Sequence, residues 1–157
     1  YALTTAYAAD HLKNMFGPDT IKITSNEIQS QNKQELFYYG LAKATKNLLD
    51  ANKNVIFFVD VPELPFFPLD CLKNKEHCQI PLADVLSRQN VYRQQLIKLK
   101  HEFPKIKIFD PLSIFCRDNI CTYKNDNLIL YRDSHHLTLE GSNYYGSQFA
   151  NWLKNNK

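Results

Sequence analysis

Apolar residues recur at helical spacing in three stretches of the chain, and each stretch predicts an amphipathic helix. The stretches are residues 31–53, 82–103 and 139–155. Pro104 should end the second helix, and the side chain of Thr138 should cap the start of the third. The residues expected to face a core are Phe37, Leu41, Ala44 and Leu48, then Val85, Tyr92, Leu96 and Leu99, and finally Tyr145, Phe149 and Trp152.

Short apolar runs between these helices predict strands. Residues 55–59 and 105–109 are typical of buried strands, residues 128–131 form a third short strand, and a helical turn is expected at 112–115. The alternation of helices and strands indicates an α/β fold with a parallel sheet, whose functional residues follow the carboxyl ends of the strands. The side chains of interest are therefore Asp60, Asp110 and residues 133–136, although a cap of the helical turn is the favoured interpretation of Asp110.

A proline-rich loop, residues 62–81, follows the first of these strands and is too long for a simple connection. It carries Cys71 and Cys78, while Cys116 and Cys121 form a second close pair. Neither spacing is that of a zinc knuckle or a redox motif. Two disulfides formed in an oxidising compartment are therefore favoured over four free thiols.

Composition narrows the class of protein. The 157 residues suit one domain, and a hydrophobic content of 44% is enough for a core. The net charge of +3 comes from scattered Lys and Arg residues, which form no basic stripe for nucleic acid. No apolar run approaches the roughly 18 residues of a membrane span. The chain opens on YALTTAYAAD, without an initiator Met or the basic segment of a signal peptide, so we expect it to be part of a longer protein.

The run LYRDSHHLTLEG, residues 130–141, concentrates the residues that could do chemistry. Ser134 is poorly placed as a nucleophile, because its neighbours are bulky and the nearest glycine is seven positions away. Asp133 and His136 are three residues apart, so one turn can bring the carboxylate to Nδ1 of the imidazole and leave Nε2 to act as a base. An alternative is equally compatible with the pattern: Asp133 caps a turn, and the histidines are surface residues without a catalytic role. A metal site of Asp133, His135 and His136 is disfavoured, because adjacent histidines diverge.

This run resembles the last sequence block of SGNH hydrolase-like domains, in the pattern Leu130-Tyr131-Arg132-Asp133-x-x-His136-Leu137-Thr138-x-x-Gly141. It is most similar to the SGNH domain fused behind the membrane part of acyltransferase family 3 proteins, which O-acetylate bacterial surface glycans. The two cysteine pairs and the proline-rich loop are also similar. The resemblance covers about residues 50–157 and implies an SGNH hydrolase-like, flavodoxin-like three-layer sandwich with a parallel sheet. Residues 1–157 would form a single, incomplete domain of this kind.

The resemblance also implies residue roles. Asp133 would be the acid and His136 the base of a Ser-His-Asp mechanism, with Ser134 a bystander and His135 a weaker alternative base. The family's serine stands in a Gly-Asp-Ser block near the start of the domain, and no such block occurs in this sequence, so the nucleophile is expected outside it. The implied activity is O-acetyl transfer to a sugar hydroxyl of a surface polysaccharide or lipopolysaccharide in the periplasm, without cofactor or metal. A membrane acyltransferase segment would lie upstream.

Further residues are candidates for contact with the glycan acceptor or the acyl donor. Arg132 and His135 are predicted to bind substrate, although a solvated charge is the simpler explanation of Arg132. Phe66 and Phe67 either line a glycan groove or form the loop's own core, and the core is favoured. Two alternative functions remain. An SGNH-type acetyl esterase is one, since water competes with a sugar hydroxyl for the same acyl-enzyme. A non-catalytic glycan-binding module is the other, favoured by the missing serine.

Overall fold

The computed structural model describes residues 2–4, 26–30, 32–73 and 78–156. The chain groups into two compact units: a first unit of Tyr1–Val59 with Arg88–Ile108, and a second unit of Asp60–Ser87 with Phe109–Lys157. Among the described residues, no helix is long and apolar enough to cross a membrane.

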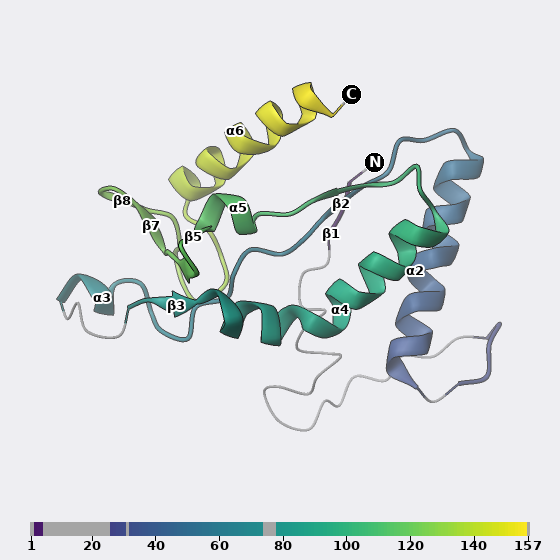
Figure 1. Ribbon diagram of the computed structural model, residues 1–157, viewed down its shortest axis with the longest axis horizontal. Helices are drawn as coiled ribbons and strands as arrows, with labels where there is room; N and C mark the ends of the chain where they lie inside the picture. The colour runs from purple at the N-terminus through teal and green to yellow at the C-terminus, as the bar shows by residue number, and fades with distance from the viewer. Residues whose placement is uncertain (1, 5–25, 31, 74–77, 157) are drawn as a thin grey trace. The chain divides into compact units, whose positions relative to one another are not determined.

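A three-stranded sheet in the order β1-β2-β4 underlies the first unit. Strand β1 pairs with β2 in parallel, with Ala2 opposite Ile56. Helix α2 precedes β2 along the chain, and α4 precedes β4 (Figure 1). The predicted α/β alternation with a parallel sheet is therefore confirmed. The bounds are Ala2–Thr4 for β1, Lys33–Asp50 for α2, Ile56–Phe58 for β2, Leu82–Glu102 for α4 and Lys107–Phe109 for β4.

Alternate residues along β2 belong to one core. Val55, Phe57 and Val59 are almost fully buried, in the period of two that a strand imposes on its side chains. The face of α4 predicted from the sequence is confirmed, because the residues expected in this unit are buried, although Gln89, which was not among them, is buried as well. The buried partners in this core are Tyr92, Leu96 and Leu99 of α4, and Ile106.

Helix α2 meets the same core through a face that differs in part from the prediction. Phe37, Leu41 and Leu48 pack against the core, but Ala44 is exposed and Thr45 is fully buried. The Thr45 hydroxyl donates to the Leu41 carbonyl at 2.7 Å, so its polar atom is satisfied inside the helix. The prediction that Ala44 faces the core is wrong, and Thr45 is buried instead. A threonine whose hydroxyl donates to the helix backbone can be buried, although apolar spacing alone would predict an exposed position for it.

Short antiparallel strands and two disulfides characterise the second unit. One sheet has the order β3-β6-β5, and a second pairs β7 with β8. The predicted disulfides, Cys71–Cys78 and Cys116–Cys121, are both present. The strands are Ile80–Pro81 (β3), Cys116–Arg117 (β5), Ile120–Cys121 (β6), Lys124–Asn125 (β7) and Leu128–Ile129 (β8), and the helices are Asp70–Lys73 (α3), Leu112–Phe115 (α5) and Leu139–Asn155 (α6).

The last predicted strand takes a different partner from the one expected. Only Leu128 and Ile129 of residues 128–131 form a strand, and it pairs antiparallel with β7 instead of extending the parallel sheet. Asp126, with a φ of 52°, supplies the left-handed backbone conformation of the tight turn between the two strands. A local hairpin forms here because two short strands joined by such a turn need no crossover connection.

The predicted inward face of α6 packs on one aromatic ring. The centroid of the Phe109 ring lies 5.4 Å from that of Tyr145, 5.0 Å from that of Phe149 and 5.3 Å from that of Trp152. These separations are those of favourable aromatic contacts. The hydrophobic face read from the sequence is therefore confirmed for this helix.

The proline-rich loop places its two phenylalanines differently. The Phe66 ring packs edge-on against Tyr123, with centroids 5.6 Å apart, whereas Phe67 is 50% exposed. The prediction of a loop core is therefore confirmed for Phe66 and wrong for Phe67. The chain bends at residues 65–66 and turns at residues 68–69, and in this irregular segment one ring lies inward and the other outward.

The start of α6 lies directly against the backbone of Leu130. The Thr138 amide donates to the Leu130 carbonyl, and the Thr138 hydroxyl donates to the Ile129 carbonyl, each at 2.9 Å. The same hydroxyl accepts from the Gly141 amide at 2.9 Å, which is the predicted helix cap. A Cβ atom at Gly141 would lie 2.0 Å from the Leu130 carbonyl oxygen. Only glycine allows this approach of helix and strand end.

Gly141→Ala should therefore destabilise the protein, although alanine is normally the better helix former. We expect the free energy of unfolding, measured by urea denaturation, to fall by about 1–3 kcal/mol, because the backbone of Leu130 must move. Gly146→Ala is the matched control on the same helix, since no atom lies within 4 Å of its Cβ position. It should gain up to about 1 kcal/mol. Equal effects of the two substitutions would contradict the close contact.

Candidate active site

A closed loop of residues 132–136 carries the predicted site. The Arg132 amide donates to the His136 carbonyl at 2.8 Å, and Tyr131 and Leu137 form an isolated antiparallel bridge below it. Leu130 and Tyr131 are almost fully buried, so the base of the loop is anchored in the core of the second unit. We call residues 132–136 the site loop. Backbone hydrogen bonds join the two ends of the site loop, which restricts where its side chains can lie.

A second backbone contact holds the tip of the site loop. The Leu64 amide, in the proline-rich loop, donates to the Ser134 carbonyl at 2.7 Å. Leu64 itself is buried in the same core. The sequence offers no signal for this contact, since a backbone donor and acceptor seventy residues apart carry no side-chain pattern. The proline-rich loop thus supports the site loop as well as carrying a disulfide.

Asp133 and His136 meet as the spacing predicted. Nδ1 of His136 lies 2.8 Å from Oδ2 and 2.9 Å from Oδ1 of Asp133. Oδ1 of the carboxylate also accepts from the backbone amides of His135, at 3.0 Å, and His136, at 2.8 Å. A ring that donates Nδ1–H to a carboxylate carries its lone pair on Nε2, which is the tautomer a general base requires.

The same contacts determine the charge of Asp133. Burial alone would raise the pKa of this carboxyl, but the amides of His135 and His136 and the His136 ring hold its pKa well below the usual range. The side chain of Asp133 is 21% exposed and that of His136 is 45% exposed. The carboxylate is therefore ionised and sheltered beside a ring that solvent can reach.

Ser134 and His135 form a separate pair beside this dyad. The Ser134 hydroxyl lies 2.9 Å from Nδ1 of His135, and the centroids of the two histidine rings are 4.0 Å apart. Nδ1 of His135 is 3.7 Å from Oδ1 of Asp133, so its contact with the carboxylate is longer than that of His136. The geometry favours His136 as the oriented ring. The bystander role of Ser134 stays a prediction.

Arg132 lies at the outer edge of the site. Its side chain is 67% exposed, and its guanidinium nitrogens Nε and Nη2 are 3.4 Å from Oδ2 of Asp133. An exposed pair at this distance contributes little to stability. The exposed side chain of Arg132 is consistent with the solvated charge expected from the sequence, and its role in substrate binding stays a prediction.

A metal could in principle use the same side chains. One potential ligand atom from each of Asp133, His135 and His136 lies within 4.8 Å of the others. The carboxylate oxygens already accept from backbone amides and the His136 ring, so a metal would have to replace the ring contact. That the site needs no metal stays a prediction.

The other carboxylates named from the sequence act mainly on their own backbone. Oδ1 of Asp110 accepts from the amide of Leu112, the first residue of α5, at 3.1 Å, although the capping position itself is Pro111 and not Asp110 as predicted. Oδ1 of Asp60 accepts from the Val61 amide at 3.0 Å. Neither hydrogen bond involves the dyad. Residues 132–136 follow a hairpin strand, and the prediction that functional residues follow the strand ends stays a prediction.

Sequence reasoning missed Tyr131, which precedes the site loop. Its side chain is almost fully buried, and its hydroxyl has no hydrogen-bond partner among the described residues. Burial raises the pKa of Tyr131 well above its ordinary value, and the charges of Asp60 and Glu63 act in the same direction. The phenol is therefore a neutral polar group beneath the loop. The position of Tyr131 directly before Arg132-Asp133 is the sequence signal that could have identified it.

Asp133 should make stability depend on pH in a defined direction. Its pKa is lower in the folded state than the value of about 3.9 expected when unfolded, so its charge stabilises the fold above about pH 4. This contribution is lost as the pH falls toward the depressed folded value. Urea unfolding of the protein and of Asp133→Asn should differ most above about pH 4, and the difference should shrink at lower pH. A difference that is constant from about pH 3 to about pH 6 would contradict the assignment.

Comparisons with known proteins concern the family and the fold of the chain. A family model described as the SGNH domain, fused to AT3 domains, matches residues 2–151. Among solved structures, the lipopolysaccharide acetyltransferase periplasmic domain of Salmonella ser. Paratyphi A is similar, with a TM-score of 0.56 and 18% sequence identity. The alignment covers 80% of this chain and 53% of that one, so the chain spans about half the length of its structural neighbour. Comparison with curated proteins finds no match.

The likeness to the solved domain supports the fold, and the family match covers nearly the whole chain. The two disulfides and the parallel pairing of β1 with β2 are among the features that the resemblance of the sequence to that family implies. The chain belongs to the family of SGNH domains fused to AT3 domains.

Proposed function

We propose that this chain supplies the base and the orienting carboxylate of an O-acyltransferase. The acyl group would be acetyl, and the acceptor a sugar hydroxyl of a bacterial surface polysaccharide or lipopolysaccharide. The observation that carries the proposal is the 2.8 Å contact between Nδ1 of His136 and Oδ2 of Asp133. The solved neighbour, a lipopolysaccharide acetyltransferase domain, supports the class of reaction.

In the first half of the reaction, His136 acts on a serine that lies outside this sequence. Nε2 takes the proton of the serine hydroxyl as its oxygen attacks the acyl carbonyl of the donor. The bond from the acyl carbon to the donor then breaks, and the leaving group takes the proton back from His136. The product is a serine ester, the acyl-enzyme.

In the second half, a sugar hydroxyl replaces the donor. Nε2 of His136 takes its proton, the sugar oxygen attacks the ester carbonyl, and the serine oxygen leaves with that proton. Asp133 holds the ring and stabilises its charged form in both halves. It can do so at neutral pH because its depressed pKa keeps the carboxylate ionised. Arg132 and His135 would contact the acceptor or the donor.

The setting of the enzyme is part of the proposal. Two disulfides close short loops, and such bonds persist in oxidising compartments outside the cytoplasm. The family description gives fusion to AT3 domains, which supports a membrane acyltransferase segment in the same protein. We therefore place the domain on the periplasmic face of a bacterial inner membrane. The finer architecture we propose is the three-layer sandwich of SGNH hydrolases.

An acetyl esterase is the second candidate. The His136 side chain is 45% exposed, so water could reach the ester as readily as a sugar hydroxyl. The two functions share the acyl-enzyme and differ only in the second nucleophile. Adding a candidate acceptor polysaccharide to the assay separates them, because a transferase would move acetyl to the glycan at the expense of free acetate.

The test of the proposed base is His136→Ala in the full-length protein, assayed with p-nitrophenyl acetate. General-base help of this type contributes about 10²–10⁴-fold to rate, so kcat/KM should fall by that amount. His101→Ala is the control, since His101 is an exposed histidine in the last turn of α4. A folded His136→Ala protein with near-normal activity would remove the proposal, and loss in both variants would show that the effect is not specific to the dyad.

A further inference from the structure

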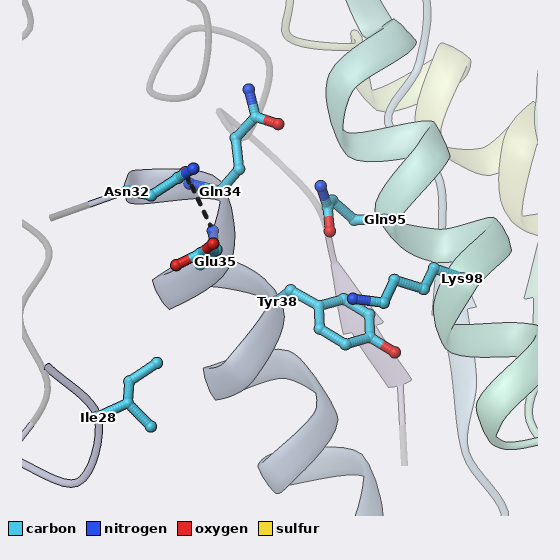
Figure 2. Close-up of a pocket in the computed structure, with 7 residues that line it drawn as sticks. All are labelled: Ile28, Asn32, Gln34, Glu35, Tyr38, Gln95 and Lys98. Atoms are coloured by element: carbon cyan, nitrogen blue, oxygen red, sulfur yellow. Dashed lines mark hydrogen bonds between the residues drawn. The ribbon is translucent and has the colours of Figure 1, made fainter. Parts of the chain in front are cut away.

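A pocket of about 420 Å³ lies in the first unit, between the start of α2 and the middle of α4. The side chains from α2 and its cap are those of Asn32, Gln34, Glu35 and Tyr38, and those from α4 are Gln95 and Lys98. Figure 2 shows Gln95 and Lys98 extending from α4 toward the α2 side, with Ile28 on the far wall. The volume falls within the range of small-molecule sites, at about 300–1,000 Å³.

Three of the seven side chains that line the pocket, those of Asn32, Gln34 and Gln95, carry amide groups that both donate and accept hydrogen bonds. The side chains of Gln34 and Gln95 form no hydrogen bond with any other described residue, so their amides are available to a ligand. Each amide offers one carbonyl acceptor and two N–H donors. Asn32 differs, because its Oδ1 already accepts from the Gln34 and Glu35 amides and caps α2. A ligand rich in hydroxyl groups matches such a lining, since every hydroxyl both donates and accepts.

The charges of the pocket are balanced. Nζ of Lys98 lies 3.8 Å from the centre of the Tyr38 ring, which holds the cation at the wall by a cation–π contact. The Glu35 carboxylate accepts from the Ser30 hydroxyl at 2.6 Å. An anionic ligand would meet Glu35 as well as Lys98, so the lining favours a neutral one. Lys98 covers one face of the Tyr38 ring, so recognition would depend on hydrogen bonds more than on stacking.

If the acceptor is a polymer, such a pocket can bind a part of it that does not react. Binding energy from parts of a substrate that do not react can be used to position the part that does. We propose that this pocket binds a neutral, hydroxyl-rich oligosaccharide segment of the acceptor glycan, other than the sugar that receives the acyl group. The identification of the ligand as the acceptor glycan rests on the proposed function. Binding of an oligosaccharide in the pocket does not depend on the reaction.

Nuclear magnetic resonance of the ¹⁵N-labelled chain tests the pocket without any catalysis. The probes are maltohexaose, cellohexaose and mannohexaose, with hexagalacturonate as the anionic comparison. We expect the side-chain amide signals of Gln34 and Gln95 to shift saturably with at least one neutral probe. The double variant Gln34→Ala/Gln95→Ala should weaken that binding about tenfold, the effect of losing one or two hydrogen bonds. Gln94→Ala is the matched control, an exposed glutamine on the same helix whose side chain bonds to Asn90.

The outcomes separate the pocket from the proposed activity. No shift of either amide with any neutral probe would overturn the inference, as would equal weakening by Gln94→Ala. Tighter binding of hexagalacturonate than of every neutral probe would overturn the assignment of a neutral ligand. Each result stands whether or not His136→Ala loses esterase activity. Binding without esterase activity would reject the transferase and leave a glycan-binding pocket, whereas activity without binding would reject the pocket alone.

Discussion

The contact between Leu130 and the start of α6 is the constraint on which the candidate site depends. The Leu130 carbonyl accepts from the Thr138 amide, and the absence of a side chain at Gly141 lets the first turn of the helix lie against that carbonyl. The seven residues between Leu130 and Thr138 are thereby closed into a loop. Within it, the Arg132 amide bonds to the His136 carbonyl, and Asp133 is left to face the ring of His136. The geometry of the dyad is therefore a consequence of how a strand end meets a helix.

The charge arrangement around Asp133 follows from the same closure. Two backbone amides of the loop point at Oδ1, and the His136 ring completes the set. The carboxylate is stabilised mainly by groups within three residues of it, whereas Arg132 adds only a long, exposed contact. Such an arrangement keeps the acid ionised without a buried partner from a distant element. It needs little of the chain beyond the loop, which is consistent with a dyad formed in a chain spanning about half of its structural neighbour.

The parts of the structure that sequence could predict are those determined by near neighbours. The dyad depends on a spacing of three residues, the cap on Thr138 and the faces of α4 and α6 on helical periodicity, and all are found as expected. The features that were wrong or missed depend on a choice of pairing or of burial that apolar spacing does not determine. Apolar content at residues 128–131 does not specify whether a strand pairs in parallel or in a hairpin. Nor could composition reveal that the Leu64 amide would hold the Ser134 carbonyl.

Catalysis and glycan binding, as proposed, rest on different kinds of structure. The dyad lies on a loop whose backbone is closed by hydrogen bonds, so its atoms are held to the short distances that proton transfer requires. The pocket is formed by long, flexible amide and lysine side chains on two helices, which can adjust to hydroxyls at several positions. A rigid site for the reacting atoms and an adaptable one for the rest of a polymer suit an enzyme that must transfer one acyl group to a repeating chain. Because the two sets of residues share no side chain, acceptor preference could change through Gln34 and Gln95 while Asp133 and His136 stay the same.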